Sequence, residues 1–295
     1  MMRLLKTAAA SVLVLAGGLS AWAGPADDPA NWRKVEPENL LQFTVNNQEI
    51  LIELRPDFAP RHVEQIRRIV REGNYDKLPF HRVIDDFMVQ GGDVYSVYQI
   101  YPRYPNIQGE FTWMRDPGRQ KIQWFGSTPQ GDRLGYFDGF IVQGQPDEVA
   151  MISDPAVART WALHCAGAAS MARAQAKDSA ATEFFLMRQS RVGVGTPLDQ
   201  NYTIWGRALT GLDVIRGIKV GPQERDGRFE NPNQADKLTK AVVVADLKEH
   251  RRPTVFVRRT DGPEFAASLS ALSVEDPTAA CALPPVDVVI ERPTP

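Results

Sequence analysis

The sequence predicts a mainly β protein, a barrel or sandwich of short strands with two helices at its ends. Short apolar runs bounded by turn residues recur along the chain, and two segments show helical periodicity. Neither βαβ alternation nor a Gly-rich phosphate loop is present. The 295 residues are 43% hydrophobic and 24% charged, a globular composition. A formal net charge of -2 gives no reason to expect a nucleic-acid partner.

The N-terminus has the pattern of a cleavable secretory signal peptide over residues 1–23. Arg3 and Lys6 precede an apolar run that ends in Ala21-Trp22-Ala23. The run is short and rich in Ala and Gly, so an uncleaved membrane anchor is the less favoured alternative. We therefore expect an exported protein without stable membrane insertion after cleavage, and a polar leader over residues 24–39.

The ordered elements follow in sequence. Two apolar runs around Asn46-Asn47 predict a β-hairpin, 41–45 and 50–54. Apolar positions 63, 66, 69 and 70 form one stripe, predicting an amphipathic helix that Gly73 ends. Two strands with a polar turn at Asp85-Asp86 follow within residues 78–94. The segment 95–163 looks irregular apart from a strand-like core at 140–142. Further strands are predicted at 168–172, 184–187 and 202–205, a short helix at 212–218, and a final strand within 237–249.

The remaining C-terminal segment, 250–295, is rich in proline. It is either an extension on the domain surface or a partly disordered tail. Cys165 and Cys281 are the two cysteines, and the sequence leaves open whether they pair. Two Cys and four scattered His do not form a recognisable metal-binding pattern.

Arg82 lies inside an apolar run, LPFHRVIDDFMVQGGDV, at residues 78–94. In an alternating strand Phe80, Arg82 and Ile84 share one face, and His81 and Val83 share the other. The ordinary interpretation is a strand-end arginine that reaches water past its apolar neighbours. The functional one is a cation held beside an apolar binding surface. Nucleophilic catalysis has little support, because no serine elbow or Ser/His/Asp spacing is recognisable.

The residues FHRVIDDFMVQGGD, at 80–93, resemble the signature of the cyclophilin family of peptidyl-prolyl cis-trans isomerases. Asp85 and Asp86 stand where that family usually has Pro-Gly. The segments SMARAQAKDSAATEFFLM and LDQNYTIWGRALTGLDVI are also similar to family segments. The resemblance implies a cyclophilin-like closed eight-stranded antiparallel β-barrel capped by two α-helices, spanning residues 40–249. A long loop insertion at about 112–163 and the 250–295 extension would be additions to it.

The resemblance also implies a role for each matching position. Arg82 matches the catalytic arginine, and Gln90 matches a residue that holds both Arg82 and the substrate. The other matching positions contact substrate: the proline-pocket walls Phe87, Met88, Phe185 and Leu198, the rim residues His81 and Tyr202, and the peptide-binding residues Ala172, Arg173 and Ala174.

Three positions depart from the family pattern. Glu183 and Thr182 stand where Gln and Ser are usual, and Pro197 stands where many members have Trp. An ionised Glu183 only accepts hydrogen bonds, so it could pair with Arg82 or Arg173. Without the Trp we expect weak cyclosporin binding.

The resemblance implies an isomerase that speeds X-Pro rotation during the folding of exported proteins. The signal peptide predicts export, and the bacterial-like SMARA form favours the periplasm over a eukaryotic secretory lumen. Its partners would be Pro-containing polypeptides, it would act as a monomer, and it would need no cofactor, metal or nucleotide. A cyclophilin-like chaperone or peptide-binding module with little turnover is the alternative. A structural envelope protein anchored through its tail is a third interpretation, based only on the Pro-rich C-terminus.

Overall fold

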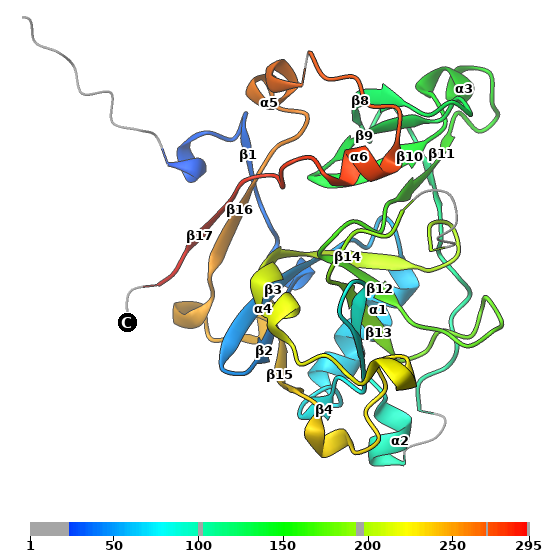
Figure 1. Ribbon diagram of the computed structural model, residues 1–295. Coiled ribbons are helices and arrows are strands. Elements are labelled where there is room, and N and C mark those ends of the chain that lie inside the picture. Colours follow the sequence, from blue (N-terminus) through cyan, green and yellow to red (C-terminus); the bar gives the residue numbers. More distant parts are fainter. Residues whose placement is uncertain (1–23, 100–102, 193–197, 270, 294–295) are drawn as a thin grey trace, which may run out of the picture.

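The computed structural model describes residues 24–99, 103–192, 198–269 and 271–293, which form a mainly β protein with short helices. The signal segment 1–23 and Pro197 lie outside the described residues. The strands form three sheets. In Figure 1 a five-stranded sheet lies above the nine-stranded main sheet, and a three-stranded sheet lies to the left of both.

The main sheet is antiparallel throughout and contains most of the predicted strands. Its order is β4 (Leu78–Pro79), β15 (Lys237–Val243), β2 (Leu40–Val45), β3 (Gln48–Leu54), β14 (Ile204–Thr210), β12 (Ala168–Met171), β13 (Phe184–Met187), β6 (Met88–Gly91) and β5 (Arg82–Ile84). The predicted β2–β3 hairpin is present. Asn46 and Asn47 both have positive φ, 50° and 61°, as a two-residue type I′ turn requires.

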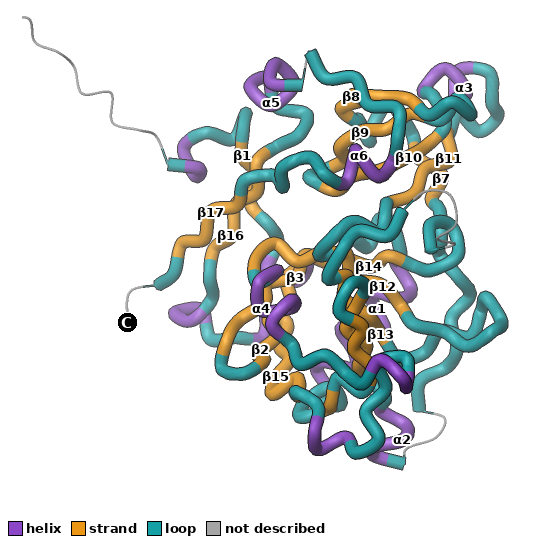
Figure 2. Tube along the Cα trace, in the orientation of Figure 1, coloured by secondary structure: helices purple, strands orange, loops and turns teal. Residues whose placement is uncertain are grey.

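The expected closed eight-stranded barrel is not what the chain forms. The main sheet of nine strands curls into a half-barrel (Figures 1 and 2). In sequence only Phe80 and His81 separate its end strands, β4 and β5. The outer edge of β5 is occupied by a loop: the Val83 N–H donates to Gly227 O at 2.8 Å, and the Phe229 N–H donates to His81 O at 3.1 Å. This loop takes the edge that a closing strand would need.

Two helices pack on the main sheet, as expected, but they are not the only helices. α1 (Pro60–Arg71) begins with a proline. Proline suits the first turn of a helix because an N–H at that position would have no partner within the helix. The predicted apolar stripe of α1 is buried. α4 (Leu212–Gly217) is the second. Four further short helices are present among the described residues: α2 (Val94–Tyr98), α3 (Asp147–Met151), α5 (Pro263–Ser268) and α6 (Pro277–Cys281).

The segment expected to be irregular forms the five-stranded sheet. Its order is β7 (Trp113–Arg115), β11 (Ala158–Ala162), β10 (Phe140–Gly144), β9 (Arg133–Phe137) and β8 (Gln123–Ser127). Most of its aromatic residues are buried in a hydrophobic core. Phe125, Tyr136 and Trp161 belong to a second hydrophobic core. Leu40 and Leu51 of the main sheet contribute to the same core, so β3 is covered on both faces and lacks simple alternation.

The leader and the C-terminal extension pair with each other. β16 (Thr254–Arg258) lies between β1 (Trp32–Lys34) and β17 (Val288–Glu291) in the three-stranded sheet. The two cysteines pair, since a disulfide joins Cys165 to Cys281 with the Cα atoms 5.2 Å apart. The described part of the extension is therefore a folded surface element. None of the helices in the described ranges has the length and apolar character needed to span a membrane.

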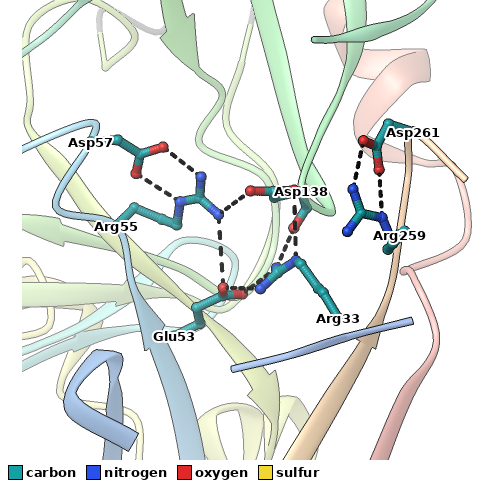
Figure 3. A network of polar contacts seen from close by, with 7 residues as sticks. All are labelled: Arg33, Glu53, Arg55, Asp57, Asp138, Arg259 and Asp261. Carbon is teal, nitrogen blue, oxygen red and sulfur yellow. Dashed lines mark hydrogen bonds and ion pairs between the residues drawn. The ribbon is translucent and has the colours of Figure 1, made fainter. Parts of the chain in front are cut away.

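A buried network of charged side chains joins the three sheets (Figure 3). Arg33 of β1 donates to both carboxylate oxygens of Glu53 on β3, at 2.6 and 2.9 Å. Arg55 donates to Asp57 and, at 2.8 Å, to Asp138 in the β9–β10 turn. Burial alone would raise the pKa of Asp138, but Arg55 and Arg33 hold it below its usual value.

Candidate active site

Arg82 is the first member of a row of side chains that crosses three neighbouring strands. Arg82 of β5 is in register with Gln90 of β6, and Gln90 is in register with Phe185 of β13. Residues directly opposite each other in antiparallel strands point to the same face of the sheet. The fold therefore presents a guanidinium, an amide and an aromatic ring side by side on one face.

That face is the outer one. The neighbouring residues on the same three strands point to the opposite face and are fully buried in the main core. They are Val83, Val89 and Leu186, which are in register with one another. Our expectation for Phe80 is wrong: it does not share the face of Arg82, because the strand breaks at Phe80 and His81, and Phe80 packs in the core.

The guanidinium of Arg82 is braced from two sides and keeps spare donors. Nη1 donates to Gln90 Oε1 at 3.3 Å, while Nε and Nη2 donate to the backbone oxygen and carboxylate of Asp226, at 3.0 and 2.5 Å. A guanidinium has five N–H donors, and these three bonds leave two that have no partner among the described residues. The Arg82 side chain is 18% exposed, so a ligand can reach it.

Gln90 connects Arg82 to Glu183, on the opposite side of the row. Gln90 Nε2 donates to Glu183 Oε2 at 2.8 Å, and His81 Nε2 lies 3.2 Å from the same oxygen. Among the described residues Glu183 therefore contacts Gln90 and His81, and it forms neither of the two pairings with Arg82 or Arg173 that the sequence allowed. Burial alone would raise the pKa of Glu183, but the contacts with His81 and Gln90 lower it below its usual value. Glu183 is thus ionised at neutral pH and fixes the orientation of the Gln90 amide.

Apolar side chains lie beside this polar row. Met88 shares the outer face of β6 with Gln90 and is 2% exposed, and Phe87 precedes it in the turn. The ring centroids of Phe87 and Phe185 are 6.4 Å apart, and Tyr202 meets Phe185 edge-on at 5.8 Å. Leu198, in the turn that leads to Tyr202, is buried in the same core. The arrangement offers an aromatic surface next to the Arg82 guanidinium.

The expected peptide-binding segment follows β12. β12 ends at Met171, one residue earlier than predicted, but the Ala172 N–H still donates to Glu183 O at 2.9 Å. Arg173 packs its guanidinium over the Tyr202 ring at 4.4 Å and donates to Asn201 O. Ala174 is exposed. Arg173 thus supports the rim rather than pairing with Glu183.

The Asp85-Asp86 turn, a departure from the family signature, has its own ion pairs. Asp85 accepts from Arg188 Nη2 at 2.7 Å and Asp86 from Arg191 Nη2 at 2.6 Å. The Arg188 N–H donates to Phe87 O at 2.9 Å, and Arg191 also lies over the Phe87 ring. The paired aspartates therefore hold the turn that positions Phe87, the function that a Pro-Gly turn would otherwise serve.

Sequence reasoning missed Asp226 and a buried group behind Phe185. Asp226 adopts positive φ before Gly227, and its only sequence signal is the Asp-Gly dipeptide of a turn.

The group behind Phe185 consists of His164, Asp199 and Ser170. His164 Nδ1 lies 2.7 Å from Asp199 Oδ1, its Nε2 lies 3.1 Å from Ser170 Oγ, and its ring stacks on Phe185. Ser170 is 0% exposed, so this trio supports the ring and cannot attack a substrate.

The fold and the site together define the class: a mainly β protein that presents one braced arginine beside an aromatic surface. In the part of the chain that the structure describes, no group of His, Cys, Asp or Glu residues is arranged to hold a metal. Residues 40–243 match the family model of the cyclophilin type peptidyl-prolyl cis-trans isomerase/CLD. The chain belongs to this cyclophilin-type family and is a peptidyl-prolyl cis-trans isomerase.

Individual relatives agree with the family match. A probable peptidyl-prolyl cis-trans isomerase of Brucella suis biovar 1 (strain 1330) is 32% identical over 241 residues, covering 82% of this chain and 96% of the relative. A putative one from Staphylococcus saprophyticus is 28% identical over 199 residues, covering 64% and 86%.

Among solved structures, cyclophilin AquaCyp293 from Hirschia baltica has a TM-score of 0.81 and 36% identity, covering 92% of this chain and 97% of its own. Because that coverage exceeds the family-model region, AquaCyp293 shares parts of the chain outside residues 40–243.

Proposed function

We propose that Arg82 catalyses X-Pro rotation by donating a hydrogen bond to the prolyl nitrogen in the twisted state. The observation that carries this proposal is the row itself: a braced guanidinium with two spare N–H donors lies beside Phe87, Met88 and Phe185. No nucleophile and no proton transfer are required, because no covalent bond is broken.

The physical problem is a barrier of ~18–20 kcal/mol, which arises because the nitrogen lone pair is delocalised into the carbonyl. In the twisted state that lone pair is localised on nitrogen and accepts a hydrogen bond well, whereas in the planar state it does not. Donation by Arg82 is therefore stronger in the transition state than in the ground state, as catalysis requires. The guanidinium stays protonated at physiological pH, and Gln90 and Asp226 fix its direction.

The apolar residues supply the grip that rotation needs. We assign Phe87, Met88, Phe185 and Leu198 to the proline ring, His81 and Tyr202 to the rim of its site, and the Ala172–Ala174 backbone to the peptide. Holding the ring on one side while the rest of the peptide turns gives orientation without strong ground-state binding. Glu183 acts through Gln90, as a positioning residue.

A peptide-binding module with little turnover is the second candidate, and the Asp226 contact favours it. Asp226 Oδ2 lies 2.5 Å from Arg82 Nη2, so a carboxylate partly neutralises the cation that catalysis uses. Asp226 is 65% exposed, however, and solvent weakens such a pair. The two unused donors of Arg82 make the enzymatic assignment the stronger one.

We further propose that the protein works on Pro-containing segments of exported proteins in the periplasm, as a monomer without cofactor. The signal-like segment 1–23 supports this placement. Cell fractionation of the full-length chain tests it. The expected result is a mature chain that starts after Ala23 in the periplasmic fraction, and an intact chain in the cytoplasm contradicts it.

The mechanism is tested by a protease-coupled isomerisation assay on a Pro-containing peptide with the Arg82→Ala and Arg82→Lys variants. We expect Arg82→Ala to lower kcat/KM roughly a hundredfold, the loss typical of one preorganised donor. Lys lacks the planar fork and should recover little. Arg119→Ala, which removes an 89% exposed cation, is the matched control. Equal rates for Arg82→Ala and wild type contradict the mechanism. A wild type that does not accelerate the reaction favours the binding module.

A further inference from the structure

A cavity of about 410 Å³ lies where three parts of the chain meet, on the outer face of the main sheet. Arg207 of β14 lines one side, and Phe140 and Ile141 of β10 line another. The third wall is the segment 281–286, which begins at the end of α6. The Cys165–Cys281 disulfide belongs to the lining and ties this wall to the chain entering β12. In Figure 1, α6 lies beside β10.

The charged group of this cavity has hydrogen-bond donors without acceptors. Arg207 Nε and Nη2 have almost no accessible surface and no hydrogen-bond partner among the described residues. A ligand cannot reach enclosed atoms, so the donor that the half-buried Arg207 presents to the cavity is Nη1. Burial lowers the pKa of Arg207 to about 10, so the guanidinium is still charged at neutral pH. A desolvated cation with unused donors is unfavourable unless an acceptor completes it.

The neighbouring carboxylates do not complete it. Glu53 is in register with Arg207 across β3 and β14, but both of its oxygens accept from Arg33. Asp138 accepts from Arg55, and no carboxylate within the described ranges forms an ion pair with Arg207. The contact that Arg207 does make is with the Phe140 ring, 5.0 Å from the guanidinium carbon.

The other lining residues are mostly apolar. They include Ile141, Leu163, Leu212, Leu283 and Val286, while Arg216 adds a second, exposed cation. No acidic side chain of the described residues lines the cavity. A hydrated inorganic anion suits such walls poorly, whereas an anion with an apolar body satisfies both the donors and the walls.

We propose that this cavity binds a small organic carboxylate with an apolar body, its carboxylate accepting from Arg207 Nη1 and its body lying against Phe140, Leu163 and Val286. The site is separate from the isomerase row. Val83, Val89, Leu186, Ala169 and Gly206 form one continuous row of register across β5, β6, β13, β12 and β14. Arg82 precedes Val83 at one end of this row, and Arg207 follows Gly206 at the other end, so both side chains lie on the outer face. The two ends are four strand spacings apart, which is about 19 Å along the sheet.

Isothermal titration calorimetry of the complete, disulfide-bonded protein with benzoate tests the proposal. Benzamide, which keeps the ring but carries no charge, and inorganic phosphate serve as comparison probes. We expect benzoate to bind more tightly than either. We expect Arg207→Met to weaken benzoate binding roughly tenfold or more, because it removes charge-assisted hydrogen bonds. Arg119→Met removes an 89% exposed cation and is the matched control for net charge, expected to bind like wild type.

The proposal is overturned if benzoate shows no binding, if benzamide or phosphate binds as tightly as benzoate, or if Arg207→Met binds like wild type. Leu283→Trp gives a second test should Arg207→Met fail to fold. It keeps the cation but fills the cavity from a half-buried wall position, and it too should lose benzoate binding. Isomerase activity should be unchanged in both variants, which separates this site from Arg82.

Discussion

Glu53→Ala is expected to destabilise the protein strongly, because it removes the carboxylate at the centre of the network in Figure 3. The Glu53 side chain is 4% exposed and accepts two hydrogen bonds from Arg33. It also lies 3.8 Å from Arg55 Nη1. Its loss leaves a partly buried guanidinium without its main acceptor.

The magnitude follows from what remains. Removing one partner of a buried pair costs about 3–5 kcal/mol. Arg33 keeps the Asp138 backbone oxygen at 2.7 Å and Arg55 keeps both other carboxylates, so the lower end, about 3 kcal/mol, applies. At about 2 °C per kcal/mol for a chain of this size, the melting temperature should fall by about 6 °C.

Thermal unfolding followed by circular dichroism measures this shift, with Asp261→Ala as the control. Asp261 forms a similar pair with Arg259, also shown in Figure 3, but the two side chains are 36% and 39% exposed. Such a pair is worth less than about 1 kcal/mol. The double variant Glu53→Ala/Arg33→Met should be less destabilised than Glu53→Ala, since no stranded cation remains. If Glu53→Ala is as mild as Asp261→Ala, the buried-network argument is wrong.

Three further outcomes are expected. Contacts with His81 and Gln90 hold the pKa of Glu183 in the folded protein below its value of 4.5 in the unfolded chain. The stability that this carboxylate contributes is therefore complete above pH 4.5, and it is lost as the pH falls through the pKa of the folded state. Urea titrations should show the difference between wild type and Glu183→Gln shrinking in acid, and a constant difference contradicts this. Asp226→Asn should lower kcat/KM roughly two- to fivefold, because Asp226 fixes the direction of the Arg82 guanidinium. The loss should be smaller in high salt, because the ion pair is exposed and salt screens it. A loss that does not depend on salt contradicts this. Replacing Cys165 and Cys281 with Ser opens a loop of 116 residues and should cost up to about 4–5 kcal/mol of stability. An unchanged melting temperature in that variant indicates that the unfolded chain is already constrained.

The sequence pattern was sufficient for the elements that are marked by turn residues or by helical spacing. The β2–β3 hairpin and α1 have turn residues and apolar spacing that depend only on nearby sequence, and both were predicted within a few residues. The five-stranded sheet was not, because its strands are short and both the second core and the main sheet bury them. Aromatic residues such as Trp161 then occur without clear alternation, so periodicity carries no signal there.

The same distinction applies to the site. Arg82, Gln90 and Phe185 lie in motifs that resemble a known family, and their common face follows from strand register. The contacts that orient them come from distant segments. Asp226 approaches Arg82 from 144 residues away, and Asp199 reaches His164 from another turn. Spacing along the chain does not determine such contacts, because they depend on how loops fold back over the sheet.

One face of one sheet has two different roles in this protein. At β3 and β14 the outer face is covered: the Glu53 side chain is 4% exposed, and Arg207 is half-buried with its Nε and Nη2 atoms enclosed. At β5 and β6 the same face carries Arg82 and Gln90 within reach of solvent. The added segments therefore bury the part of the face that lies away from the proposed peptide site, and the buried ion network holds them there. Loosening the network should reduce stability and carboxylate binding before it reduces isomerase activity, since the braces of Arg82 come from β6 and the loop before β15.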